Sequence, residues 1–150
     1  MSDGRPIGPD RIRALIPHHG AMCLLDSVLE WTARDIVCRA VSHLSPDNPL
    51  RHRGALSTLA GAEYGMQAAC LHGALIAGGA VRRPGFLAAL RGVRCHAARL
   101  DDPALGALLV RASLEHREEA GAIYGFSLAA EDGVVLVEGR AAIATPEGGA

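Results

Sequence analysis

The stretch ALSTLAGAEYGMQAACLHGALIAG, residues 55–78, decides the fold. Its residues are apolar around most of a helical circumference, whereas a surface helix carries a single apolar stripe. The spacing predicts one long helix that begins near Ala55 and ends at the glycines 78–79. Such a helix must be buried on nearly all sides. Glu63 lies in its middle, where a carboxylate is costly unless it faces water or has a function.

The segments on both sides of this helix have the lengths and turn boundaries of strands. A short helix, GPDRIRALIP at residues 8–17, is expected first, with a proline near each end. Two strands forming a hairpin precede the loop 45–54, and four strands follow the long helix. The expected strands are 22–31, 35–44, 86–100, 107–119, 122–132 and 134–145.

Six strands and one buried helix predict an α+β fold, in which an antiparallel sheet curls around the helix. This arrangement is the hotdog fold. The chain has 150 residues, of which 49% are hydrophobic, and this fits one domain over residues 1–150.

Charge and cysteine content exclude several classes of protein. The formal net charge is −1, so we expect no binding to nucleic acid, and no apolar run is long enough for a membrane span. The four cysteines are far apart in the sequence, which favours reduced thiols in the core of a cytoplasmic protein. Neither a metal site nor a cofactor is expected. The cysteines are Cys23, Cys38, Cys70 and Cys95.

Three motifs resemble those of the 3-hydroxyacyl-acyl-carrier-protein dehydratases. The segment PHHGAMCLLDSVLEW, residues 17–31, resembles the N-terminal motif P-H-R-x-P-F-L-L-x-D-R-V of that family. The sequence EYGMQ, residues 63–67, is similar to the E-A-x-A-Q of its central helix. The longer GAEYGMQAACLHGAL, residues 61–75, resembles a divergent branch associated with aryl polyene and related polyketide-like synthesis. The order of the strands agrees with this family over nearly the whole chain.

The resemblance implies a catalytic role for Glu63. Dehydration of a 3-hydroxyacyl thioester needs one group to accept a proton and another to donate one to the leaving hydroxyl. A carboxyl group among apolar side chains can keep its proton and donate it. Gln67, one turn later, is expected to orient that carboxyl group by a hydrogen bond, and Tyr64 to orient the substrate. Gly54, at the expected helix start, is expected to help polarise the thioester carbonyl.

The partner histidine departs from the family pattern. The family has its histidine about fourteen residues before the carboxylate, and this chain has Pro49 there. We take His52, in the loop before the helix, and His18, in the IPHHG turn, as the catalytic candidates, with His43 in a substrate-orienting role. His72 is nine residues after Glu63, on the opposite side of the helix, and is expected to pack against the sheet.

The resemblance also implies partners. The substrate would arrive on an acidic acyl carrier protein, which the arginines of RRPGFLAALRGVR, residues 82–94, help to hold. Hotdog proteins usually pair through their sheets, so at least a homodimer is expected. Two other functions stay open: an acyl thioesterase that works with the carboxylate alone, and a non-catalytic subunit that binds acyl chains or supports a catalytic partner.

Overall fold

The computed structural model describes residues 5–16, 20–79 and 86–144. Two α-helices are present in these residues, α1 (Pro9–Leu15) and α2 (Gly61–Ile76). Six strands complete the fold: β1 (Ser27–Trp31), β2 (Asp35–Ala40), β3 (Phe86–Cys95), β4 (Leu108–Glu118), β5 (Gly121–Ala129) and β6 (Val135–Ala144). Single turns of 3-10 helix connect them: η1 (Gly20–Met22), η2 (Ser42–Leu44), η3 (Thr58–Ala60) and η4 (Pro103–Leu105).

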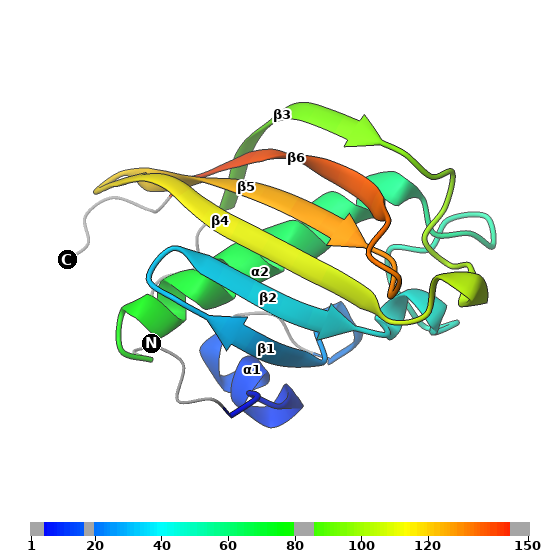
Figure 1. Cartoon of the computed structure of the whole chain (residues 1–150), viewed down its shortest axis with the longest axis horizontal. Helices are drawn as coiled ribbons and strands as arrows, with labels where there is room; N and C mark the ends of the chain where they lie inside the picture. The colour runs from blue at the N-terminus through cyan, green and yellow to red at the C-terminus, as the bar shows by residue number, and fades with distance from the viewer. Residues whose placement is uncertain (1–4, 17–19, 80–85, 145–150) are drawn as a thin grey trace.

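The six strands form one antiparallel sheet in the order β1-β2-β4-β5-β6-β3. The sheet curves over α2, which lies behind it in Figure 1. This arrangement confirms the predicted α+β hotdog fold. Each strand overlaps its predicted segment, but β1 begins five residues later, β2 ends four residues earlier and β3 ends five residues earlier than predicted. Among the described residues, no helix has both the length and the apolar character needed to cross a membrane.

The central helix is shorter at its start than the sequence predicts. Residues 55–57 are not helical, because Ala55 pairs with His52 and Leu56 bonds to a distant segment. The Leu56 N–H donates to the Asp101 carboxylate, and the Leu56 carbonyl accepts from the N–H of Leu100. The side chain of Ser57 then caps η3 by accepting from the N–H of Leu59, and α2 begins only at Gly61.

Two glycines of α2 allow the helix to lie close against the sheet. A Cβ atom at Gly61 would stand 2.5 Å from Val137 Cγ1, and one at Gly65 would stand 2.7 Å from the ring of Phe126. Both distances are too short for a side chain at either position. The close approach buries most of α2, as its all-round apolar surface predicts.

The four cysteines are free thiols, as expected, but they do not share one environment. Cys38 lies in the core between the sheet and α2, and burial raises the pKa of its thiol to about 12. Cys95 is exposed at the end of β3, so the prediction that every cysteine lies in the core is wrong for Cys95.

Candidate active site

Glu63 lies in the first turn of α2 and is partly exposed, so the expectation that it lies in the middle of the helix is wrong. The helix dipole favours a carboxylate at this position, because unpaired backbone N–H groups gather at a helix N-terminus. Cys70 lies two turns further along the helix. Burial, with a smaller contribution from the negative charge of Glu63, raises the pKa of the Cys70 thiol to about 11. The side chains of Glu63 and Cys70 therefore lie on the same face of α2.

Gln67 holds the segment that precedes β1, and this corrects the expectation that its amide orients Glu63. Its Oε1 accepts from the N–H of Leu24 at 3.0 Å, and its Nε2 donates to the carbonyl of Met22 at 2.6 Å. The side chain is fully buried, and these two bonds satisfy the N–H of the buried Leu24 and the carbonyl of the part-buried Met22. We call residues 20–26 the strap. Gln67 fixes the strap against α2 one turn from Glu63.

Tyr64 joins α2 to the loop after β2. The Ser42 hydroxyl donates to the carbonyl of Leu24 at 2.7 Å, so the phenol of Tyr64, 2.7 Å from Ser42 Oγ, is the donor in their contact. Asn48 Nδ2 in turn donates to the Tyr64 oxygen at 3.0 Å. Burial raises the pKa of this phenol. Residues of α2 thus bind both backbone groups of Leu24. Gln67 accepts from its N–H directly, and Tyr64 is linked to its carbonyl through the hydroxyl of Ser42.

His43 is fully buried in η2. Its Nε2 lies 2.8 Å from the carbonyl of Gly106, and that contact requires the Nε2–H tautomer. Burial lowers the pKa of His43, so the ring is neutral near neutral pH. Its Nδ1 is buried without a hydrogen-bond partner among the described residues and therefore presents a free lone pair.

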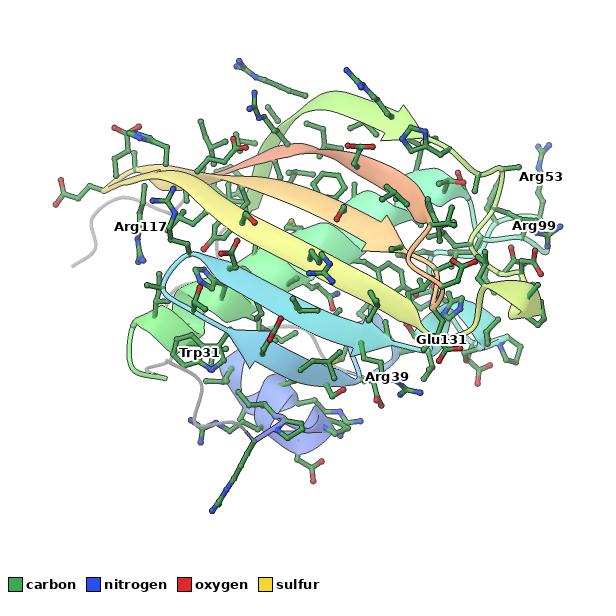
Figure 2. All side chains as sticks on the ribbon, in the orientation of Figure 1. Trp31, Arg39, Arg53, Arg99, Arg117 and Glu131 are labelled. Atoms are coloured by element: carbon green, nitrogen blue, oxygen red, sulfur yellow. The ribbon has the colours of Figure 1, made fainter. Side chains whose placement is uncertain are left out.

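His52 and Gly54 belong to a tight exposed turn. The backbone of His52 pairs with that of Ala55 at 2.8 and 3.1 Å, and the two residues between them have positive φ angles, 51° at Arg53 and 75° at Gly54. Such a two-residue turn favours glycine. Gly54 lies seven residues before Gly61, so the expectation that it stands at the start of the long helix is wrong. Arg53 is labelled at this end of the molecule in Figure 2.

Two further histidine predictions have different outcomes. His72 is buried on α2, with Nδ1 2.8 Å from the hydroxyl of Tyr124 and Nε2 2.9 Å from the carbonyl of Thr32. This confirms the expected packing against the sheet. His18 lies outside the described residues.

Sequence reasoning missed Asp101, which organises the approach to α2. Its buried carboxylate accepts from Leu56 N–H at 3.1 Å, from Arg99 at 2.8 and 2.6 Å, and from Arg51 at 3.3 Å. The Arg99 guanidinium holds the pKa of this carboxyl well below its usual range. Nothing in the local sequence RLDD distinguishes it from an exposed aspartate.

In the described part of the chain, no group of three acidic, histidine or cysteine side chains is placed to hold a metal ion.

Comparison with solved structures supports the fold. The dehydratase heterocomplex ApeI:P from Xenorhabdus doucetiae contains a similar chain, with a TM-score of 0.78, 22% identity, and 91% of each chain covered. Zebra fish thioesterase superfamily member 2 has a TM-score of 0.64 and 15% identity over 91% of this chain and 94% of that one. A hypothetical thioesterase with coenzyme A from Streptococcus pneumoniae has a TM-score of 0.56 and 11% identity, covering 79% and 84%. At these identities the likeness concerns the fold.

The family comparison reaches further than the fold. A search of curated protein sequences found no significant match. The model of the ApeP-like family, described as ApeP dehydratase, matches residues 10–149 and so spans the strap, α2 and all six strands. The chain therefore belongs to the ApeP-like dehydratase family, and it is a hydro-lyase with the hotdog fold.

Proposed function

We propose that this enzyme removes water from a 3-hydroxyacyl thioester carried by an acyl carrier protein, giving a 2-enoyl thioester during polyene synthesis. The family match over residues 10–149 is the observation that carries the proposal. It is supported by a carboxylate in the first turn of a buried helix, beside a strap that Gln67 and Tyr64 hold.

In the proposed reaction, a base takes the proton from the carbon next to the thioester carbonyl. The electron pair of that bond forms the carbon–carbon double bond, and the bond from the next carbon to its hydroxyl oxygen breaks. Glu63 gives its proton to the departing hydroxyl, which leaves as water. The helix start at Glu63 is suited to this step, because its N–H groups stabilise the carboxylate that remains.

The base in this proposal is a histidine. His52 and His18 are the candidates by position in the sequence. Among the described histidines, His43 has features that suit a base: a neutral ring, fixed by its bond to Gly106, with Nδ1 unpaired. The His43 side chain is fully buried, so this role requires that the substrate reach Nδ1 inside the protein. Substitution of each histidine separates these assignments.

We also propose that the chain works as a dimer, with itself or with a second dehydratase-like chain. Among the described strands, β3 lies at the edge of the sheet and pairs with β6 alone, so the other side of its backbone has no partner strand within the described residues. Phe86 and Leu90 on this strand are 56% and 39% exposed, which favours a covered position in an assembly. The related structure from Xenorhabdus doucetiae is described as a heterocomplex.

The test is to incubate the purified protein with a 3-hydroxyacyl carrier protein and follow the acyl mass. Loss of one water is expected for the wild type, with a fall of at least about a hundredfold for Glu63→Gln, in line with the usual contribution of a general acid. Glu30→Gln, on the exposed face of β1, is the matched control and should keep the wild-type rate.

Release of the free acid would identify a thioesterase instead. A Glu63→Gln variant at full rate would exclude the proposed acid. His18→Ala, His43→Ala and His52→Ala are compared at equal folded concentration, and the base is the histidine whose removal lowers kcat. If the wild type shows no turnover alone but is active when it is mixed with a second dehydratase-like chain, the active unit is a heteromer.

A further inference from the structure

The face of the sheet turned away from α2 carries a groove of about 660 Å³. This face points toward the viewer in Figure 1. Gly125 and Ser127 of β5 form the floor, and longer side chains of the neighbouring strands stand on both sides. We call it the outer groove. Its charged side chains are Arg91, Arg94, Arg111, Arg140, Glu115 and Glu138.

The strand register arranges these residues in two rows across the sheet. In one row, Arg111 is paired with Ser127, Ser127 with Glu138, and Glu138 with Arg94. In the other row, Ser113 is paired with Gly125, Gly125 with Arg140, and Arg140 with Arg91. Directly paired residues of an antiparallel sheet point to the same face. The small residues of β5 therefore leave a depression between two walls that both carry arginine.

The outer groove has more positive than negative charge. Its two carboxylates already have partners, since Glu115 lies 2.9 Å from Arg140 and Glu138 lies 2.8 Å from His96. Within the described residues, no carboxylate forms an ion pair with Arg91, Arg94 or Arg111.

Arg91 and Arg140 are paired directly across β3 and β6, where like charges repel each other, and the ion pair of Arg140 with Glu115 offsets part of this repulsion. The whole chain has a formal net charge of −1, so the positive charge is a local property of the outer groove. An anionic partner would relieve the repulsion.

We propose that the outer groove is a docking surface for an acidic segment of the acyl carrier protein that brings the substrate; the inference rests on the proposed function. The guanidinium groups are spread over β3, β4 and β6 and do not converge on one point, which suits a row of carboxylates better than one small anion. The groove lies on the opposite side of the sheet from α2 and Glu63, so a carrier bound there is captured and steered but is not yet in the reacting position.

This role makes a kinetic prediction. Docking that speeds encounter without touching the reacting atoms changes KM for the carrier-bound substrate and leaves kcat unchanged. We compare the double variant Arg91→Ser/Arg111→Ser with Arg117→Ser. Arg117 has the same charge and the same strand as Arg111, but it lies near the tip of the β4–β5 hairpin, outside the groove (Figure 2).

For the double variant, KM for the 3-hydroxyacyl carrier protein should rise about tenfold, since each exposed ion pair contributes up to a factor of about five. The kcat value, and kcat/KM for the N-acetylcysteamine thioester of the same acyl group, should stay within about twofold of wild type. The melting temperature should not fall, because Arg91→Ser removes a like-charge contact. Added salt should raise KM for the wild type and for Arg117→Ser more than for the double variant.

A direct measurement of binding tests the docking surface independently of catalysis. In titration calorimetry with the holo-carrier protein, the double variant should bind about tenfold more weakly than Arg117→Ser. Equal affinities would overturn the inference, and so would a changed oligomeric state in light scattering, which would assign the groove to contacts between copies. Inorganic pyrophosphate binding more tightly than the carrier would assign it to a small anion. If the wild type dehydrates neither substrate but the calorimetric difference holds, the proposed reaction fails and the docking surface stands.

Discussion

Gln67 and Leu24 are joined by a buried hydrogen bond across 43 residues, with the Oε1 of the amide accepting the backbone N–H at 3.0 Å. The other end of the same amide donates to Met22, so one side chain on α2 holds the strap at two points. The strap thereby becomes a fixed wall beside Glu63.

Gln67→Met should therefore destabilise the protein. The substitution keeps the size of the side chain but leaves the buried Leu24 N–H and the part-buried Met22 carbonyl without their partner, at a cost of about 1–3 kcal/mol in the free energy of unfolding. Urea unfolding measures this cost. Glu63→Gln is the control, since it should lower the rate of dehydration and leave stability within about 0.5 kcal/mol. Wild-type stability for Gln67→Met would mean that the strap is held by other contacts.

Alanine at two glycines of α2 should have opposite effects. Gly65→Ala places a Cβ 2.7 Å from the Phe126 ring and forces the helix away from the sheet, which should cost about 1–3 kcal/mol. A Cβ at Gly73 meets nothing within 4 Å, so Gly73→Ala should stabilise the helix by about 0.5–1 kcal/mol. Urea unfolding of the two variants measures both effects. The close packing of α2 would be refuted by two changes of the same sign.

Stability should fall as the pH is lowered through the range where free histidine gains a proton. Burial lowers the pKa of both His43 and His72 below the ordinary value of 6.5. At a pH above 6.5 both rings are neutral, folded or unfolded, and their contribution to stability is complete. Below 6.5 the unfolded chain binds protons that the folded chain does not, so stability decreases by up to about 1.4 kcal/mol per pH unit for each ring, until the folded pKa is reached.

Urea unfolding between pH 7.5 and pH 5 measures this slope. His72→Gln should be less stable at pH 7.5, because it loses contacts to Tyr124 and Thr32, yet its stability should depend less on pH. His116→Gln, at an exposed position on β4, is the matched control and should keep the wild-type slope. A slope in His72→Gln equal to that of the wild type would contradict the neutral, buried state of this ring.

The thiol of Cys70 reports on the charge of Glu63. With its pKa raised to about 11, Cys70 is almost entirely protonated at pH 8 and should be alkylated far more slowly than the exposed Cys95. Glu63→Gln removes a negative charge that contributes to this rise, so alkylation of Cys70 by iodoacetamide should become faster. Cys38, whose pKa is raised by burial alone, should be unaffected and is the internal control. An unchanged rate at Cys70 would mean that Glu63 points elsewhere.

The strands and the central helix follow from local patterns. Segment lengths and turn residues mark the strands of the sheet, and the all-round apolar surface of residues 61–76 marks the buried helix. The start of that helix could not be found in this way. Residues 55–60 continue the apolar pattern, but Asp101 and Leu100 bind the backbone at Leu56 and keep it out of the helix. A tertiary hydrogen bond overrides local propensity there.

The residues of the candidate site also differ in whether the local sequence predicts them. A sequence motif points to Glu63. Its position in the first turn of α2 suits a carboxylate, because the helix dipole favours negative charge there. The partners of Gln67 and Tyr64 could not be found, because the strap and the loop after β2 lie more than fifteen residues away in the sequence. His52 was ranked by its distance along the chain, and this distance says nothing about which imidazole nitrogen is left unpaired in the fold.

The alternation of β5 separates two properties of the enzyme on one strand. Tyr124, Phe126 and Leu128 are buried toward α2, whereas Gly125 and Ser127 form the floor of the outer groove. On the proposed docking at the outer groove, substitutions at the second set would change which carrier protein is recognised without altering the packing of the first. A related chain would then acquire a new delivery partner through a few outward-facing positions, and an engineer would redirect the enzyme to another synthase by the same route.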